Sequence, residues 1–176
     1  MRKRLFYWEL AGFLFTAALG ALLRSTYGWG GGTFAAAFSA VNGSVWEHMK
    51  LLFFPMFLFS VLQTWAMGRN YPDFLAVRAA AVLAGAALYP VLFYTYTGVL
   101  GYRLPWADAA VFLLADLGAF LLDFRLLGRG RLSQPWQQVV GLLALWAVAF
   151  LFVWCTFRPP HLALWRDMAA GVWGIP

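Results

Sequence analysis

Long apolar stretches dominate the chain, and short segments rich in glycine, proline and charged residues separate them. A helix needs about 20 mostly apolar residues to cross a membrane. Five stretches satisfy this requirement, at residues 5–23, 45–67, 74–100, 106–127 and 136–157. Pro55 and Pro90 lie inside two of them and are expected to kink those helices, because proline donates no backbone hydrogen bond. The pattern predicts one all-α domain over residues 1–176, a polytopic membrane bundle of five transmembrane helices.

Two further segments are too short or too polar to cross a membrane. Residues 25–43 are rich in glycine and other small residues, with a short apolar run at residues 34–38. We expect an interfacial helix or a re-entrant segment there, on the outer face. Residues 161–176 carry Leu162, Trp165 and Met168 at helical spacing, which predicts a short C-terminal helix lying on the outer surface.

The composition agrees with a membrane location and excludes several other classes of protein. Hydrophobic residues make up 63% of the chain and charged residues only 11%, which leaves too little polar surface to cover a soluble domain. The net charge of +6 does not indicate a nucleic-acid partner, because the basic residues stand at the ends of apolar runs. Most of them fall on the inner side if the N-terminus is cytoplasmic and the C-terminus outside, the topology we expect in the plasma membrane. Membrane lipids are then the expected partners, and a homo-oligomer stays open.

The most polar entry into any predicted span leads into the second one. Ser44, Glu47 and His48 follow the i, i+3, i+4 spacing, so they share one face of the helix. One interpretation is structural: Ser44 and Glu47 form a capping box, and Lys50 extends to the lipid headgroups. The other is functional. Glu47 and His48 are then candidate catalytic residues, and the candidate binding residues are Asn42, Ser44, Glu47, His48 and Lys50.

A divalent metal is a further hypothesis for the outer side. His161, the second of the two histidines, and Asp167 are predicted to lie on the same side as Glu47 and His48. Imidazole and carboxylate groups are ligands that suit zinc or a similar divalent ion. No metal-binding spacing motif accompanies them, so these four residues are candidate ligands on the strength of their predicted location alone.

Acidic residues also lie inside the predicted spans, where an ionised group costs about 2.5–3.5 kcal/mol. Asp116 and Asp123 are seven residues apart and face the same way. Asp116 lies near the middle of its span with no basic residue at the same depth, which favours a functional role. Glu9 and Asp123 lie closer to the inner surface, where an ion pair with Arg78 or Arg125 would explain them structurally. Glu9, Asp116 and Asp123 are therefore candidate binding residues, and a structural ion pair is the alternative for Glu9 and Asp123.

The segment at residues 41–55 resembles a bacterial family of integral membrane proteins whose function is unknown. Its members are similar to this chain in having five spans and a signature of the form N-E-S-x-W-E-H-x-K-L, here residues 42–51. The resemblance implies no activity, but it adds Trp46 to the candidate binding residues and implies that six residues matter together: Glu9, Asn42, Trp46, Glu47, His48 and Lys50. The chain departs from the family at Gly43, where the pattern has glutamate, and at Arg24, where histidine is expected.

Three functions stay open at this point. The leading hypothesis is a small membrane protein that binds, and in its wider form translocates, an ion or small polar solute along a path from His48 to Asp116 and Asp123. The alternative is a membrane-embedded enzyme, metal-dependent in one version, that acts on a lipid or lipid-linked substrate at the outer leaflet with Glu47 and His48 as base or ligands. The third is a non-catalytic accessory subunit whose polar residues only pair helices.

Overall fold

All five predicted apolar stretches fold as long α-helices in the computed structural model, which describes residues 2–175. The long helices are α1 (Arg2–Thr26), α3 (Val45–Met67), α4 (Phe74–Leu100), α5 (Pro105–Leu126) and α6 (Pro135–Phe157). Three short elements connect or follow them: α2 (Gly32–Phe38) and the 3-10 turns η1 (Gly68–Asn70) and η2 (Ala163–Trp165). No strand occurs within the described residues, so the prediction of an all-α bundle is confirmed.

Local sequence signals begin and end these helices. The Ser44 hydroxyl accepts a hydrogen bond from the Glu47 amide at 3.3 Å and caps the start of α3. Pro105 and Pro135 occupy the first turn of α5 and α6, where proline is tolerated because those amides have no partner within the helix. Gly101 ends α4 with a φ of 78°, a conformation that glycine adopts without strain. The helix boundaries therefore follow largely from residues close to them in the sequence.

Four of the long helices are long and apolar enough to cross a membrane: α1, α3 continued by η1, α4 and α6. The fifth, α5, has 22 residues but is not among these four. It carries Asp108, Asp116, Asp123 and Arg125, which lower its hydropathy. Length and composition thus support four of the five predicted spans.

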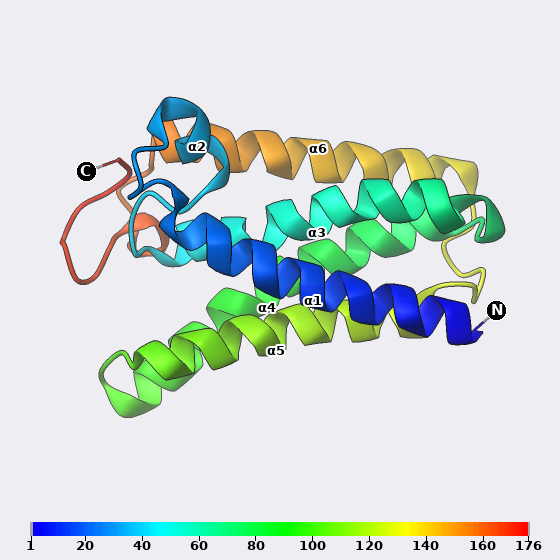
Figure 1. The fold of residues 1–176 in the computed structure, drawn as a ribbon, viewed down its shortest axis with the longest axis horizontal. Coiled ribbons are helices and arrows are strands. Elements are labelled where there is room, and N and C mark those ends of the chain that lie inside the picture. Colours follow the sequence, from blue (N-terminus) through cyan, green and yellow to red (C-terminus); the bar gives the residue numbers. More distant parts are fainter. Residues whose placement is uncertain (1, 176) are drawn as a thin grey trace.

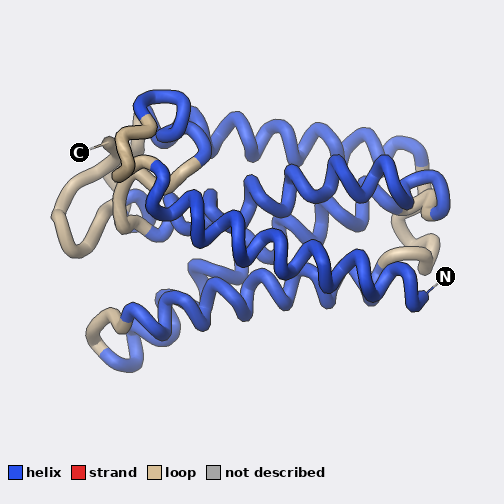
Figure 2. The backbone as a smooth tube through the Cα atoms, in the orientation of Figure 1, coloured by secondary structure: helices blue, strands red, loops and turns tan. Residues whose placement is uncertain are grey.

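The five long helices form one bundle (Figures 1 and 2). Helix α4 packs against α3, α5 and α6, while α1 packs against α3 and α5. The end of α1, the short helix α2, the start of α3 and the segment after α6 gather at one end of the bundle (Figure 1), which we call the His48 end. The chain starts at the opposite end, which we call the Arg78 end.

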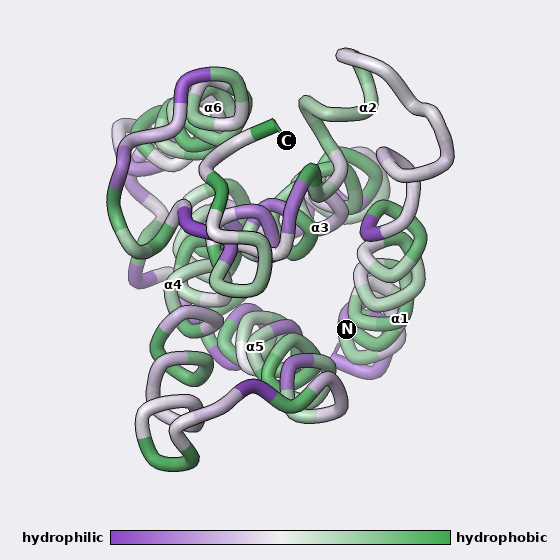
Figure 3. Tube along the Cα trace, turned by 90° about the vertical axis from the view of Figure 1, so that its left-hand side faces the viewer, coloured by the Kyte–Doolittle hydropathy of each residue, from purple (hydrophilic) through white to green (hydrophobic). Residues whose placement is uncertain are grey.

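Apolar side chains cover the outside of the bundle, and several charged side chains lie inside it. Trp65 is 92% exposed, whereas Arg78 is 1% exposed and Lys50 is fully buried. The helices are largely hydrophobic along their length when the bundle is viewed from the His48 end (Figure 3). A soluble domain shows the opposite distribution, so this pattern is typical of a protein that packs in lipid.

The two segments predicted to lie outside the spans differ in outcome. Residues 25–43 contain the seven-residue helix α2, which packs against α3 and α6. The predicted C-terminal surface helix is wrong, because residues 161–175 contain only the turn η2 and an isolated bridge between Arg166 and Trp173. The Asp167 carboxylate accepts hydrogen bonds from the amides of Ala169 and Ala170, which folds the chain into a turn instead of a helix.

Candidate functional site

The charged residues at the start of α3 form a closed, buried cluster. The Lys50 ammonium lies 2.6 Å from the Glu47 carboxylate and donates to the Ala36 carbonyl and the Thr156 hydroxyl, both at 2.8 Å. Glu47 also accepts a hydrogen bond from the Val41 amide at 3.2 Å. Because Lys50 is fully buried, the expectation that it extends to the headgroups is wrong. The cluster links α2, α3 and α6, and all three hydrogens of the Lys50 ammonium have acceptors within it.

Asn42 and Trp46 fasten the C-terminal segment to the start of α3. The Asn42 side chain accepts a hydrogen bond from the Ser44 amide at 2.9 Å and donates to the Gly174 carbonyl at 2.7 Å. The Trp46 ring packs against Trp165 of η2, with ring centroids 4.7 Å apart. In the predicted capping box, the Glu47 side chain accepts a hydrogen bond from the Ser44 amide. The Asn42 side chain accepts this hydrogen bond instead.

Asp167 holds the same junction from the C-terminal side. Its carboxylate accepts hydrogen bonds from the backbone amides of Gly43 at 2.7 Å and Ala169 at 2.8 Å. Burial by itself raises the pKa of Asp167, but these hydrogen bonds outweigh it and place the pKa below its ordinary value. A Cβ atom at position 43 would lie 3.0 Å from an Asp167 carboxylate oxygen. Glycine at this position therefore leaves the Asp167 carboxylate room to reach the backbone.

The four candidate metal ligands are not brought together. Glu47 pairs with Lys50, and Asp167 bonds to backbone amides. His161 is exposed, and its ring packs against Trp173 with centroids 5.2 Å apart. Within the described chain, no three His, Cys, Asp or Glu side chains are grouped as metal ligands. The geometry gives no support to the metal hypothesis.

One ring nitrogen of His48 is buried without a hydrogen-bond partner in the described chain, as are the Trp46 indole nitrogen and the Tyr89 hydroxyl nearby. The Nδ1 atom lies 2.9 Å from the Ser44 carbonyl, and the ring stacks parallel to Tyr89 with centroids 6.0 Å apart. The Nε2 atom is buried and has no hydrogen-bond partner within residues 2–175. A carbonyl accepts but cannot donate, so Nδ1 of the neutral ring carries the hydrogen and Nε2 presents a lone pair.

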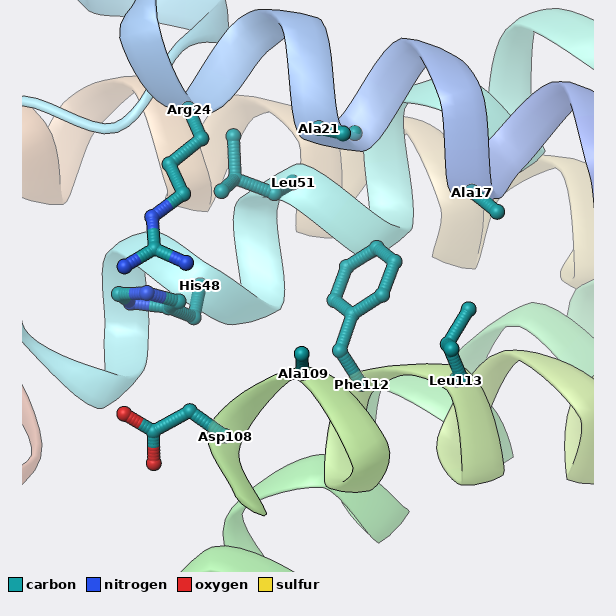
Figure 4. Close-up of a pocket in the computed structure, with 10 residues that line it drawn as sticks. Ala17, Ala21, Arg24, His48, Leu51, Asp108, Ala109, Phe112 and Leu113 are labelled. Carbon is teal, nitrogen blue, oxygen red and sulfur yellow. The ribbon is translucent and has the colours of Figure 1, made fainter. Parts of the chain in front are cut away.

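The His48 ring lines a cavity of about 260 Å³ between α1, α3 and α5 (Figure 4). Three polar side chains line it, namely Arg24, His48 and Asp108. In Figure 4 the Arg24 guanidinium lies beside the His48 ring, and Asp108 extends from α5 on the other side of that ring. The rest of the wall is apolar and consists largely of small residues, namely Ala17, Gly20, Ala21, Leu51, Ala109, Phe112 and Leu113.

The charge of Asp108 is compensated, whereas that of Arg24 is not. Arg103 forms an ion pair with Asp108 at 2.8 Å, and the Tyr96 hydroxyl donates a hydrogen bond to the same carboxylate. No carboxylate of the described chain lies within ion-pair distance of Arg24. Arg24, which is itself exposed, therefore brings to the rim of the cavity one positive charge that has no carboxylate partner among these residues.

A second buried cluster lies at the Arg78 end. Arg78 is 3.3 Å from Glu9 and 3.3 Å from Asp123, and it also donates to the Gln63 side chain. Gln63 in turn donates to Glu9 at 2.7 Å. Arg78, and not Arg125, thus supplies the ion pair that the sequence analysis offered as the structural explanation of Glu9 and Asp123.

Asp116 belongs to neither cluster. Its side chain on α5 is fully buried, and neither carboxylate oxygen has a hydrogen-bond partner within residues 2–175. The cavity that His48 lines reaches Phe112 and Leu113, one helical turn before Asp116. The predicted path from His48 to Asp116 is therefore interrupted in this structure.

Comparison with known proteins assigns a family but no activity. A family model described as DUF6512, a family of unknown function, matches residues 2–175. The chain belongs to this family. No curated protein and no solved structure matches it. The expectation of a family of unknown function is confirmed, and the activity has to be argued from the cavity.

His48 was identifiable from the sequence, whereas most of the residues that surround it were not. Arg24 had a usable signal, because Ala17, Gly20 and Ala21 precede it at helical spacing and place small residues and Arg24 on one face of α1. The sequence held no such signal for Asp108. This residue comes from α5, and its approach to His48 depends on how α1, α3 and α5 pack. The DUF6512 chain thus builds this site from three helices that are distant in sequence.

Proposed function

We propose that this protein is a small multi-pass protein of the plasma membrane that binds an anionic amphiphile in the cavity beside His48. The membrane location is supported by four apolar helices of spanning length and by the exposed apolar side chains. In this proposal α5 is the fifth span, and the distribution of lysine and arginine places the His48 end outside. The ligand then enters from the outer leaflet.

The observation that carries the proposal is the pair formed by His48 and Arg24. A buried polar atom without a partner costs about 1–3 kcal/mol, so the free Nε2 atom of His48 is expected to meet a donor supplied by a ligand. Arg24 adds a positive charge that no carboxylate of the described chain compensates. A headgroup with anionic oxygens and a hydroxyl hydrogen satisfies both residues at once.

The wall of the cavity selects for an apolar body on the same ligand. It is formed by small side chains of α1 and α5, such as Ala17, Gly20 and Ala109, and by the Phe112 ring. These surfaces gain nothing from a hydrated ion but pack well against a hydrocarbon chain. An amphiphile therefore fits the cavity better than the small polar solute expected from the sequence. Binding is also better supported than translocation, because Phe112 separates the cavity from Asp116.

The test measures lipid binding by the full chain in nanodiscs of phosphatidylcholine, with phosphatidylglycerol added as an anionic amphiphile that also carries hydroxyl groups. Native mass spectrometry then counts bound lipids for the wild type, Arg24→Gln and His48→Leu. Arg24→Gln is expected to bind about 10-fold more weakly, because it loses a charge-assisted hydrogen bond, and His48→Leu about 2- to 10-fold more weakly, because it loses a neutral one. Arg158→Gln is the matched control, because Arg158 is an exposed arginine at the same end but outside the cavity.

Two results would overturn this proposal. One is unchanged binding in Arg24→Gln. The other is an equal loss in Arg158→Gln, which would mean that the surface charge of the His48 end, and not the cavity, attracts the lipid. Inorganic phosphate added as a competitor distinguishes a lipid headgroup from free phosphate as the source of the anionic oxygens. Displacement of the lipid by phosphate would show that the cavity does not require an apolar body on its ligand.

The same cavity supports a second candidate function, an enzyme that hydrolyses an ester of such an amphiphile. The observation that favours it is the contact between Nδ1 of His48 and the Ser44 carbonyl, which holds the ring with Nε2 available as a general base. Nε2 would take a proton from water as it attacks the ester carbonyl, and Arg24 would stabilise the oxyanion. The intermediate would then collapse with cleavage of the ester C–O bond, and Nε2–H would return the proton to the departing alcohol. Incubation of the protein with phospholipid and detection of free fatty acid tests this. Release that continues unchanged in His48→Gln would exclude it.

A further inference from the structure

Polar and aromatic layers alternate along the interface between α1 and α5. Residues of α1 meet residues of α5 in antiparallel order, with contributions from α3 and α4. From the His48 end to the Arg78 end the layers are Arg24 with His48 and Asp108, Gly20 with Phe112, Thr16 with Asp116, Gly12 with Phe120, and Glu9 with Asp123 and Arg78. The two outer polar layers are the sites described above. The middle polar layer has no role in either of them.

Close contacts fix the register of the middle layer. A Cβ atom at Gly20 would lie 2.7 Å from the Phe112 ring, and one at Gly12 would lie 2.4 Å from the Phe120 ring. Thr16 lies midway between the two glycines, and Asp116 lies midway between the two phenylalanines. Both side chains are fully buried, and both have polar atoms without hydrogen-bond partners within residues 2–175. The register thus places two unpartnered polar side chains at the same level of the bundle.

A third polar group lies next to this layer. Helix α3 runs through Pro55, which has no amide hydrogen to donate to the Leu51 carbonyl one turn earlier. That carbonyl oxygen would lie 3.0 Å from a Cβ atom at Gly20, so it faces α1 between the cavity and Thr16. The Leu51 carbonyl therefore lacks its usual amide donor one turn later, on the side of the layer that faces the cavity.

The surroundings of Asp116 do not compensate a negative charge. On the α4 side, Gly85 packs against Ala115 and Ala119, the neighbours of Asp116 on α5, and Leu52 of α3 approaches the same glycine. The nearest basic group towards the Arg78 end is Arg78 itself, which is engaged by Glu9 and Asp123. Towards the His48 end, Arg103 is engaged by Asp108. Arg24 and His48 lie on the other side of Phe112 from Asp116. Arg24 lines the cavity there, and the Ser44 carbonyl holds the His48 ring, so neither pairs with Asp116.

We propose that Asp116 is a proton-binding site in the interior of the bundle, and that its proton exchanges through the cavity beside His48 when the Phe112 ring moves aside. A neutral carboxylic acid avoids the cost of a buried, unpaired charge. The acid hydroxyl is then a donor at the level of the Thr16 hydroxyl, which also has no hydrogen-bond partner within residues 2–175. Phe112 is the only layer between Asp116 and the cavity on α5, whereas Phe120 and the Arg78 cluster both lie on the opposite side.

Infrared spectroscopy of the full chain in lipid tests the protonation state. A protonated carboxylic acid gives a carbonyl stretching band that a carboxylate lacks, and isotope labelling of aspartate carboxyl carbons assigns the band to aspartate. We expect this band at neutral pH in the wild type and in the control Asp123→Asn, and its loss in Asp116→Asn. Absence of the band in the wild type, or its survival in Asp116→Asn, would overturn the proposal. A band that disappears when sodium is added would assign the layer to a metal cation instead.

The route of the proton is tested by transfer into heavy water, which shifts the same band as the proton exchanges. Phe112→Ala is expected to speed up the shift, because it opens the layer between the cavity and Asp116. Phe120→Ala, the matched control on the opposite side, is expected to leave the rate unchanged. A faster shift in Phe120→Ala alone, or in neither variant, would refute entry through the cavity. Phe112→Leu serves as the milder substitution if Phe112→Ala does not fold.

Discussion

Replacing Lys50 by methionine is expected to destabilise the protein strongly, although Lys50 touches no ligand in the proposed function. The ammonium has three acceptors, namely the carboxylate of Glu47, the carbonyl of Ala36 and the hydroxyl of Thr156. Methionine fills similar space but leaves the buried Glu47 carboxylate with hydrogen bonds only from the Val41 amide and the Thr156 hydroxyl. Breaking a buried ion pair by removing one partner costs about 3–5 kcal/mol, and we expect a loss in this range.

The assay is unfolding in mixed micelles titrated with a denaturing detergent and followed by tryptophan fluorescence. Trp46 reports on the affected region, because it adjoins Glu47 in α3 and packs against Trp165. Lys3→Met, at the chain's other lysine, is the control and is expected to change the free energy of unfolding by less than about 0.5 kcal/mol, since Lys3 is exposed.

A double-variant cycle separates the ion pair from general packing. Glu47→Gln combined with Lys50→Met is expected to cost at least about 2 kcal/mol less than the sum of the two single variants, because neither charge is then left alone. Strictly additive losses, or a loss below about 1 kcal/mol in Lys50→Met, would refute the interpretation of this cluster as a coupled, buried ion pair.

Three further predictions concern other parts of the molecule. Gly12→Ala is expected to lower the free energy of unfolding by about 1–3 kcal/mol, because the new Cβ would overlap the Phe120 ring; Gly98→Ala, in α4 with open space around it, is expected to be neutral or stabilising in the same titration. Arg78→Met is expected to be at least as damaging as Gly12→Ala, since it leaves two buried carboxylates unpaired, and equal stability to the wild type would contradict that. Asp167 has a lowered pKa in the folded chain, so its contribution is complete above about pH 4, its unfolded value, and is lost as the pH falls through the folded pKa. Limited proteolysis at decreasing pH should therefore release the C-terminal segment, and Asp167→Asn should remove this pH dependence.

The positions of the long helices were predictable because each depends on a continuous apolar run and on residues next to it. The predicted stretches 45–67 and 74–100 coincide with α3 and α4, and Ser44 caps α3 as its sequence position indicates. The C-terminal segment was not predictable in this way. Its apolar spacing favours a helix, but the Asp167 carboxylate bonds to Gly43, which lies 124 residues away in the sequence, and to the amides that follow it. A contact of that range has no local signature.

The candidate site was predictable only in part, for a similar reason. His48 drew notice because it is a histidine at the start of an apolar stretch, and Asp116 because it is an acid inside one. Lys50 was expected to face the headgroups, whereas Thr156, 106 residues later, receives its hydrogen bond in the interior. The partner of a polar group in a spanning helix depends on which helices meet, and the sequence of one helix does not specify this.

By itself, the sequence determined that the chain forms long apolar helices, four of them long and apolar enough to cross a membrane, and which few polar residues need an explanation. Only the tertiary structure decided that Glu47 and Lys50 satisfy each other, that His48 keeps a free nitrogen beside Arg24, and that the helix register puts Asp116 at the level of Thr16. The physical reason is that α3 and α4 carry apolar residues on every side and so lack one distinct polar face. The hydrophobic pattern that orients a helix in a soluble protein therefore does not say which face turns inward, and close packing at small residues such as Gly12 and Gly20 sets the register instead.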